Sequence, residues 1–166
     1  MNNKWEQLIM NEIMNQVKVI PPPRPKVNEE IIRIAAGKIV TQFSKPPTQD
    51  DEDYYVRDIF DSYYYGMNGY ELAKRLDDHC GWDIDVNDVN VLDDMDHEVR
   101  NVLENREKEW AKEYNIQPTL EINTKIKEGV IVGIDEYHAA RYKVKPYDCI
   151  NDNRYILIKF EDAIQI

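Results

Sequence analysis

Carboxylates are the most concentrated reactive groups in this chain, and almost all of their excess lies in residues 50–114. That segment holds 20 Asp and Glu against 7 Lys and Arg, and the formal net charge of the whole chain is −11 at pH 7. The segments on either side are nearly neutral. Carboxylates can take part in acid-base catalysis, hold a cation or face a basic partner, so their spacing has to decide among these roles.

A cation site is the first possibility, in the run from Asp83 to Asp94. Oxygen-bearing side chains fall there at positions 1, 3, 5 and 12 of an EF-hand, the calcium-binding loop between two helices. Position 6 is Asp88 instead of the glycine that the sharp turn requires, and position 12 is Asp94 instead of the longer Glu that contacts calcium with both oxygens. We therefore predict no metal site.

Catalysis would have to use His79, His97 or His138, together with Cys80 or nearby carboxylates. None of these residues forms a known catalytic pattern: the sequence has no HExxH, no GxSxG and no glycine-rich phosphate loop. The glycines are scattered. The sequence thus predicts a protein that is not an enzyme and that needs no cofactor.

Direct DNA binding is the third possibility, because Glu71 to Leu76, a turn and a second short helix would resemble the first half of a helix-turn-helix. A recognition helix must pass between phosphates, yet this one would carry Asp83, Asp85 and Asp88 with no base before Arg100. We predict no direct contact with nucleic acid.

An acidic surface with interleaved tyrosines remains. Five or six tyrosines within 17 residues are more than one helix face can bury, and exposed tyrosine beside carboxylate is a favourable composition for an interface. We predict that a basic partner binds this surface, including the acidic face of residues 98–113. The candidate partner-binding residues are Asp50, Asp51, Asp53, Tyr54, Asp58, Asp61, Asp83, Asp85, Asp88, Asp93, Asp94, Asp96 and Glu98.

Helices are the elements that must position these residues. Apolar residues spaced three and four apart predict five amphipathic helices. The first covers residues 4–18, the second runs from a cap at Asn28 to about residue 43, and the third runs from about residue 54 to a stop at Gly66. The fourth covers residues 69–79, and the fifth covers residues 88–114 with a break near Asp96. The capping-box pattern of Asn68 and Glu71 starts the fourth. The Pro-rich stretch 20–27 predicts a stiff spacer between two helices; a ligand for an SH3 or WW domain is the alternative.

Beyond Pro118 the pattern becomes extended. Short β-rich runs at 119–122, 129–134, 141–145 and 154–160 predict an antiparallel meander, to which the tail 163–166 can add a strand. The segments Lys127–Gly133, Tyr142–Lys145 and Tyr155–Phe160 resemble the strands of SH3-like and KOW-type barrels. The predicted fold is therefore α+β, with an acidic helical domain over 1–116 and a small antiparallel sheet or SH3-like barrel over 117–166.

Neither a membrane-spanning run nor a secretory leader is present in the sequence, which predicts a cytoplasmic location and no membrane partner. Two distant cysteines, Cys80 and Cys149, are read as thiols and not as a disulfide. The sequence carries no signal for the oligomeric state.

By size, acidity and lack of a catalytic motif, residues 50–114 resemble phage-encoded inhibitors of host defence, the acidic anti-restriction and anti-CRISPR proteins that mimic DNA. This resemblance rests on charge distribution, so no residue role is transferred. It implies an inhibitor, acting in the host-cell cytoplasm, that occupies the nucleic-acid-binding surface of a nuclease, CRISPR or restriction complex. The alternative is a structural or adaptor protein of a viral or cellular assembly that docks through its β domain.

Overall fold

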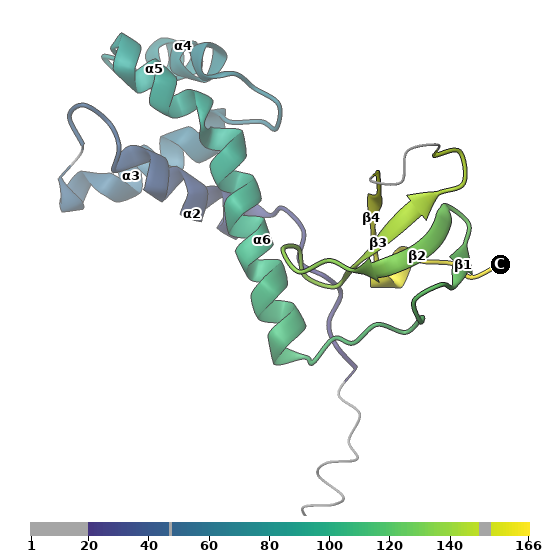
Figure 1. Ribbon diagram of the computed structural model, residues 1–166. Coiled ribbons are helices and arrows are strands. Elements are labelled where there is room, and N and C mark those ends of the chain that lie inside the picture. The colour runs from purple at the N-terminus through teal and green to yellow at the C-terminus, as the bar shows by residue number, and fades with distance from the viewer. Residues whose placement is uncertain (1–19, 47, 150–153) are drawn as a thin grey trace, which may run out of the picture.

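Helices occupy the first part of the chain and a small sheet the last part, as Figure 1 shows for the computed structural model. The structure describes residues 20–46, 48–149 and 154–166. The helix predicted over residues 4–18 lies outside these ranges. Within them the order of elements confirms the predicted α+β fold.

The helices are α2 (Glu29–Val40), α3 (Gln49–Ser62), α4 (Gly69–Cys80), α5 (Val86–Asp93) and α6 (Met95–Glu113). The strands are β1 (Lys125–Ile126), β2 (Gly129–Ile134), β3 (Arg141–Pro146) and β4 (Ile156–Lys159), and a 3-10 turn, η1 (Phe160–Asp162), follows them. Helix α6 packs along α2, and Figure 1 shows it running from the helical part down to the sheet.

Polar side chains set the starts of three helices. The Asn28 side chain accepts a hydrogen bond from the Ile31 amide at the start of α2. Asn68 and Glu71 form the predicted capping box of α4, and Asp85 forms a second capping box with Asp88 at α5. Each cap satisfies backbone amides that lack a partner in the first helical turn.

Some helix boundaries differ from the sequence prediction: α2 ends at Val40 and not near residue 43, and α3 begins at Gln49 and not near residue 54. Helix α3 ends at Ser62 and not at Gly66, because Tyr63 turns into an extended conformation and its hydroxyl donates to Asp96 of α6. The long helix predicted over 88–114 is two helices, α5 and α6, that meet at Asp94, close to the predicted break.

The helical core gathers the apolar faces of all five described helices. Ile39, Ile59, Leu76, Leu92 and Val99 are at most 1 % exposed. Full burial of such a side chain contributes about 1.5–3 kcal/mol relative to its exposed state. This core holds α3, α4 and α5 together at the end of the molecule that carries the acidic segment.

The sheet is an antiparallel meander in the order β1-β2-β3-β4, with a bulge between Ile131 and Gly133. The tail makes one antiparallel bridge, from Gln165 to Ile126 of β1, but residues 163–166 form no strand, contrary to the prediction. Residues 119–122 form no strand, contrary to the prediction. Their backbone is held instead by Tyr142, whose buried hydroxyl accepts hydrogen bonds from the Thr119 and Leu120 amides at 2.9 Å.

A buried charge cluster joins the helices to the sheet. The Arg24 guanidinium donates four hydrogen bonds, to both carboxylate oxygens of Glu161 and to the carbonyls of Ala139 and Ala140 before β3. It also forms an ion pair with Glu107 of α6 at 3.2 Å. It also lies over the Trp110 ring, 5.0 Å from its centroid. Arg24 belongs to the Pro-rich stretch, so this stretch is anchored between the two parts of the fold, a contact that sequence reasoning missed.

Candidate acidic interface around Trp82

The loop between α4 and α5, residues 81–85, is here called the Trp82 loop. Two hollows flank it and share Gly81, Trp82, Asp83 and Ile84. The Tyr54 hollow, about 460 Å³, opens toward α3 and the end of α2. The Tyr70 hollow, about 440 Å³, opens toward α4 and includes Tyr70, Lys74 and Asp77. The Tyr70 hollow is lined by residues of the acidic segment alone, whereas residues 43–45 also line the Tyr54 hollow.

Trp82 is fixed by its neighbours and forms the base of this region. Helix α4 ends at Gly81, whose φ of 71° is a left-handed conformation that favours glycine. The chain then turns Trp82 inward, where its indole N–H donates to the Asp58 carboxylate at 3.1 Å. The ring packs on Tyr55, with centroids 4.4 Å apart, and against Phe43 at 5.8 Å. The loop is thus held by both a buried hydrogen bond and aromatic contacts.

Four of the predicted site residues line the Tyr54 hollow together: Tyr54, Asp83, Asp85 and Asp88. Tyr54 is 45 % exposed, and Asp83 and Asp85 are exposed. Cys80 also lines this hollow, and burial together with the charge of Asp58 raises the pKa of its thiol. The negative charge of Asp61 raises this pKa further, so Asp61 lies close to Cys80. Residues that are 34 positions apart therefore meet at one site.

Asp58 is the predicted site residue that the structure removes from the surface. It is 6 % exposed, and it accepts the Trp82 indole N–H and a weaker contact from Arg57 at 3.4 Å. The negative charge of Asp58 is the main cause of the raised pKa of the Tyr54 hydroxyl. The role of Asp58 is to position Trp82, and it is not available as a contact residue.

A second group of predicted residues lies at the junction of α5 and α6 and ties the fold together. Asp93 accepts from the Gly69 amide at 2.7 Å, and Asp96 accepts from the Tyr63 hydroxyl and the Gly66 amide. Glu98 faces Lys38 at 3.4 Å. Asp94 is exposed, and its side chain makes no capping bond to α6. These residues do not line either hollow.

The start of α3 accounts for the remaining predicted residues. Asp51 accepts a hydrogen bond from the Thr48 hydroxyl at 2.7 Å, and Asp53 is exposed. Asp50 lies in the first turn of α3, and its side chain is outside the described part of the structure. A negative charge near a helix N-terminus is favourable, so these acids help to start α3 as well as to charge its surface.

Several exposed carboxylates form no hydrogen bond or ion pair with residues 20–46, 48–149 and 154–166. In the helical part they include Asp53, Asp61, Asp77, Asp78, Asp83 and Asp94, and in the sheet part Glu121, Glu136 and Asp148. Sequence reasoning missed Asp77 and Asp78. They stand toward the C-terminus of α4, where the negative end of the helix dipole disfavours an acid, and that unfavourable placement is the signal that could have found them.

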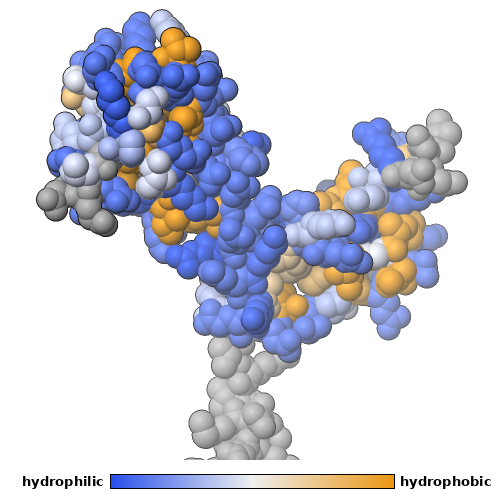
Figure 2. Space-filling model, turned by 60° about the vertical axis from the view of Figure 1, so that its left-hand side comes forward, coloured by the Kyte–Doolittle hydropathy of each residue, from blue (hydrophilic) through white to orange (hydrophobic). Residues whose placement is uncertain are grey.

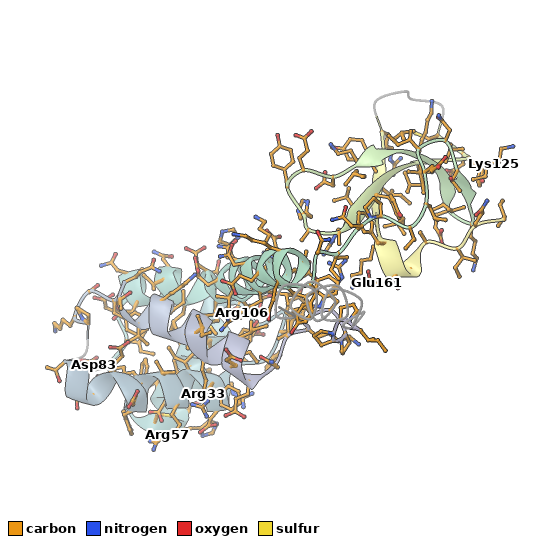
Figure 3. All side chains as sticks on the ribbon, turned by 90° about the horizontal axis from the view of Figure 1, so that it is seen from below. Arg33, Arg57, Asp83, Arg106, Lys125 and Glu161 are labelled. Atoms are coloured by element: carbon orange, nitrogen blue, oxygen red, sulfur yellow. The ribbon has the colours of Figure 1, made fainter. Side chains whose placement is uncertain are left out.

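Backbone hydrogen bonds at the start of α5 lower the pKa of the Asp85 carboxyl. The amides of Asp88 and Asn87 donate to the Asp85 carboxylate and hold its pKa below the ordinary value, and the nearby Lys45 acts in the same direction. Figure 3 places Asp83 at the end of the helical part that is farthest from Glu161 and Lys125. Figure 2 shows that the visible face of the helical part is mostly hydrophilic, with small apolar areas between the charged side chains.

Groupings that would support a reaction or a metal are not found in the part of the chain that the structure describes. No three His, Cys, Asp or Glu side chains gather there as a metal site, and the Asp83–Asp94 run is largely the helix α5. No described helix combines the length and apolar character that crossing a membrane requires. No protein-family model, curated protein or solved structure matches the chain.

Proposed function

We propose that the protein is a non-enzymatic inhibitor that binds the basic nucleic-acid-binding surface of a host nuclease or of a CRISPR or restriction complex, in the manner of a DNA mimic. The observation that carries this proposal is the set of exposed carboxylates near the Trp82 loop that form no hydrogen bond or ion pair with the described residues. Asp77 and Asp83 line the hollows. Asp78 follows Asp77 in α4, and the charge of Asp61 acts on the Cys80 thiol beside the loop. A free carboxylate on a stable surface is a candidate contact; one already hydrogen-bonded inside the fold is not.

Electrostatics explains how such a surface would act. Fixed carboxylates reproduce the repeated negative charge that a basic groove binds in DNA, and their field speeds the encounter with that groove. Exposed tyrosines beside them, Tyr54, Tyr64, Tyr65 and Tyr70, add apolar contact area and hydroxyl donors. Binding of this kind weakens as salt concentration rises.

The test is displacement of DNA from purified DNA-binding proteins with basic clefts, measured by the fluorescence anisotropy of a labelled duplex. We expect the protein to release the duplex from at least one nuclease or defence complex at about 0.05 M salt. Because salt also weakens the binding of the duplex, the salt dependence is measured without DNA, and the affinity of the protein for that nuclease should be lower at about 0.2 M salt than at about 0.05 M. The triple variant Asp77→Asn, Asp78→Asn, Asp83→Asn should lose most of this activity.

A matched control removes the same charge elsewhere. Glu121, Glu136 and Asp148 are exposed in the sheet part, so Glu121→Gln, Glu136→Gln, Asp148→Asn changes the net charge equally. This variant should retain the activity. Equal losses in both triple variants would show that only net charge matters, and no release from any protein in the panel would contradict the proposal.

A specific observation favours the alternative, an adaptor that docks through the sheet. A hollow of about 580 Å³ lies beside β2 and is lined mainly by apolar residues, among them Leu120, Ile122 and Ile134. Ile122 is 56 % and Ile134 44 % exposed. A partner bound here would resist salt. A complex that survives high salt and is weakened by Ile134→Ser would therefore favour the adaptor function.

A further inference from the structure

We infer that the Tyr54 hollow is a binding subsite for an arginine side chain of the basic partner. The inference deepens the proposed function and rests on it for the partner, but its test needs only a peptide. The volume of the hollow, about 460 Å³, lies within the range of about 300–1,000 Å³ that is usual for ligand sites. Aromatic rings and carboxylates line it together, which is the composition that a guanidinium requires.

The aromatic wall is formed by Tyr54, Tyr55 and Trp82. A cation over the face of such a ring is attracted by its quadrupole. The protein already shows this chemistry at the same residue: the Arg57 guanidinium lies over Tyr54, 4.9 Å from the ring centroid. Arg57 does not line the hollow. Trp82 is held by its hydrogen bond to Asp58, so the wall is in place before any ligand binds.

The charge of the hollow is negative. Asp83, Asp85 and Asp88 line it against one cation, Lys45. Asp83 has no donor among the described residues, so both of its oxygens can accept hydrogen bonds. The N-terminus of α5 opposes a cation with a partial charge of about +0.5, which three carboxylates outweigh. The depressed pKa of Asp85 keeps this one carboxylate ionised in mildly acidic solution.

Arginine fits this combination better than lysine. Its guanidinium is planar, so it can stack on a ring while its edge donates two parallel hydrogen bonds to a carboxylate. It is also less strongly hydrated than the lysine ammonium, which lowers the cost of entering a partly enclosed site. Basic clefts that bind DNA are lined by such side chains, and so the occupant is an arginine that otherwise contacts phosphate.

The experiment is an NMR titration of the ¹⁵N-labelled protein with a hexapeptide of alternating glycine and arginine, followed through the indole N–H signals. Trp82 reports on the hollow. The comparison signal is Trp110, which donates to the Pro22 carbonyl and lines a separate hollow that holds Glu30, Glu109 and Glu113 beside Arg106. Trp82→Phe and Trp110→Phe assign the two signals. We expect the Trp82 signal to shift and saturate while the Trp110 signal stays in place.

Peptide and protein variants then test the chemistry. The lysine version of the peptide should bind about two- to five-fold more weakly, and the version with citrulline, which is uncharged, should not bind. Asp83→Asn should weaken binding by a similar factor. Lys45→Gln should strengthen it, whereas Lys125→Gln, the same change on the exposed β1 surface, should leave the affinity unchanged.

Results that contradict the subsite can be distinguished from results that contradict the proposed function. Equal shifts at Trp82 and Trp110, equal binding of the citrulline peptide, or equal effects of Lys45→Gln and Lys125→Gln would overturn the subsite. If the protein displaces DNA but Trp82 does not respond to the peptide, the subsite is wrong and the proposed function stands. If Trp82 binds the peptide but no DNA is displaced, the subsite stands and the proposed function fails.

Discussion

Glu107 of α6 lies between the guanidinium groups of Arg24 and Arg141, with nitrogen-oxygen distances of 3.2 and 3.1 Å. Its side chain is 5 % exposed. The variant Glu107→Gln keeps the shape of this side chain and removes its charge. Two guanidiniums then face each other, and Glu161 is the nearest remaining carboxylate, 2.6 Å from the Arg24 Nε.

The loss of unfolding free energy expected for Glu107→Gln follows from how deeply the charged side chains around it are buried. Removing one partner of a fully buried ion pair costs about 3–5 kcal/mol. Arg24 is as buried as Glu107, but the Arg141 side chain is 25 % and the Glu161 side chain 43 % exposed, so water can partly solvate the charges that remain. We therefore expect the lower end, about 3 kcal/mol of unfolding free energy. That is a large share of the roughly 5–15 kcal/mol that stabilises an ordinary domain.

Urea unfolding followed by circular dichroism and by tryptophan fluorescence measures this loss. Trp110 lies next to Arg24 and reports on the junction. The matched control is Glu109→Gln, two residues along α6, where the side chain is 66 % exposed and pairs with Arg106 at 3.1 Å. An exposed pair contributes about 0–1 kcal/mol. Equal urea midpoints for the two variants would refute the claim that the charge cluster holds the two parts together.

Three further predictions concern the fold. Asp58→Ala should destabilise the protein by about 1–3 kcal/mol, because the buried Trp82 indole N–H loses its acceptor, and urea midpoints measure this. Gly69→Ala should lower the melting temperature, since a Cβ there overlaps the backbones of Val89 and Asp93; Gly133→Ala, which meets nothing within 4 Å, should not. Hydrogen bonds outweigh burial and hold the pKa of Asp135 and of Glu161 below the ordinary values. The unfolded chain then binds more protons as the pH falls below about 4, so stability should drop there, and a melting temperature independent of pH from 6 to 3 would contradict this.

Local signals predicted the helical part well. Asn28 and the Asn68–Glu71 pair cap helices where the sequence indicated, since a capping bond depends on residues only three positions apart. Gly66 misled the prediction for the end of α3. The contact that ends this helix joins Tyr63 to Asp96, and a contact across 33 positions leaves no periodic pattern in the sequence.

The candidate site was only partly predictable for the same reason. Counting charges located the acidic segment. It could not separate carboxylates that accept hydrogen bonds from other parts of the chain from those that face solvent. Asp58, Asp93 and Asp96 are of the first kind and Asp83 is of the second. Arg24 was missed because a single arginine among prolines carries no sign of its five distant hydrogen-bond and ion-pair contacts.

The most direct test of the central claim is a pull-down from bacterial host lysate at about 0.1 M salt, run in parallel with three forms of the protein. These are the unmodified chain, the Asp77→Asn, Asp78→Asn, Asp83→Asn variant and the Glu121→Gln, Glu136→Gln, Asp148→Asn control. We predict that the first and third retain the same nucleic-acid-binding protein, that the second does not, and that higher salt elutes it. Retention of that protein by all three forms, or a retained partner that resists salt, would contradict the claim that the acids around the Trp82 loop form the binding surface.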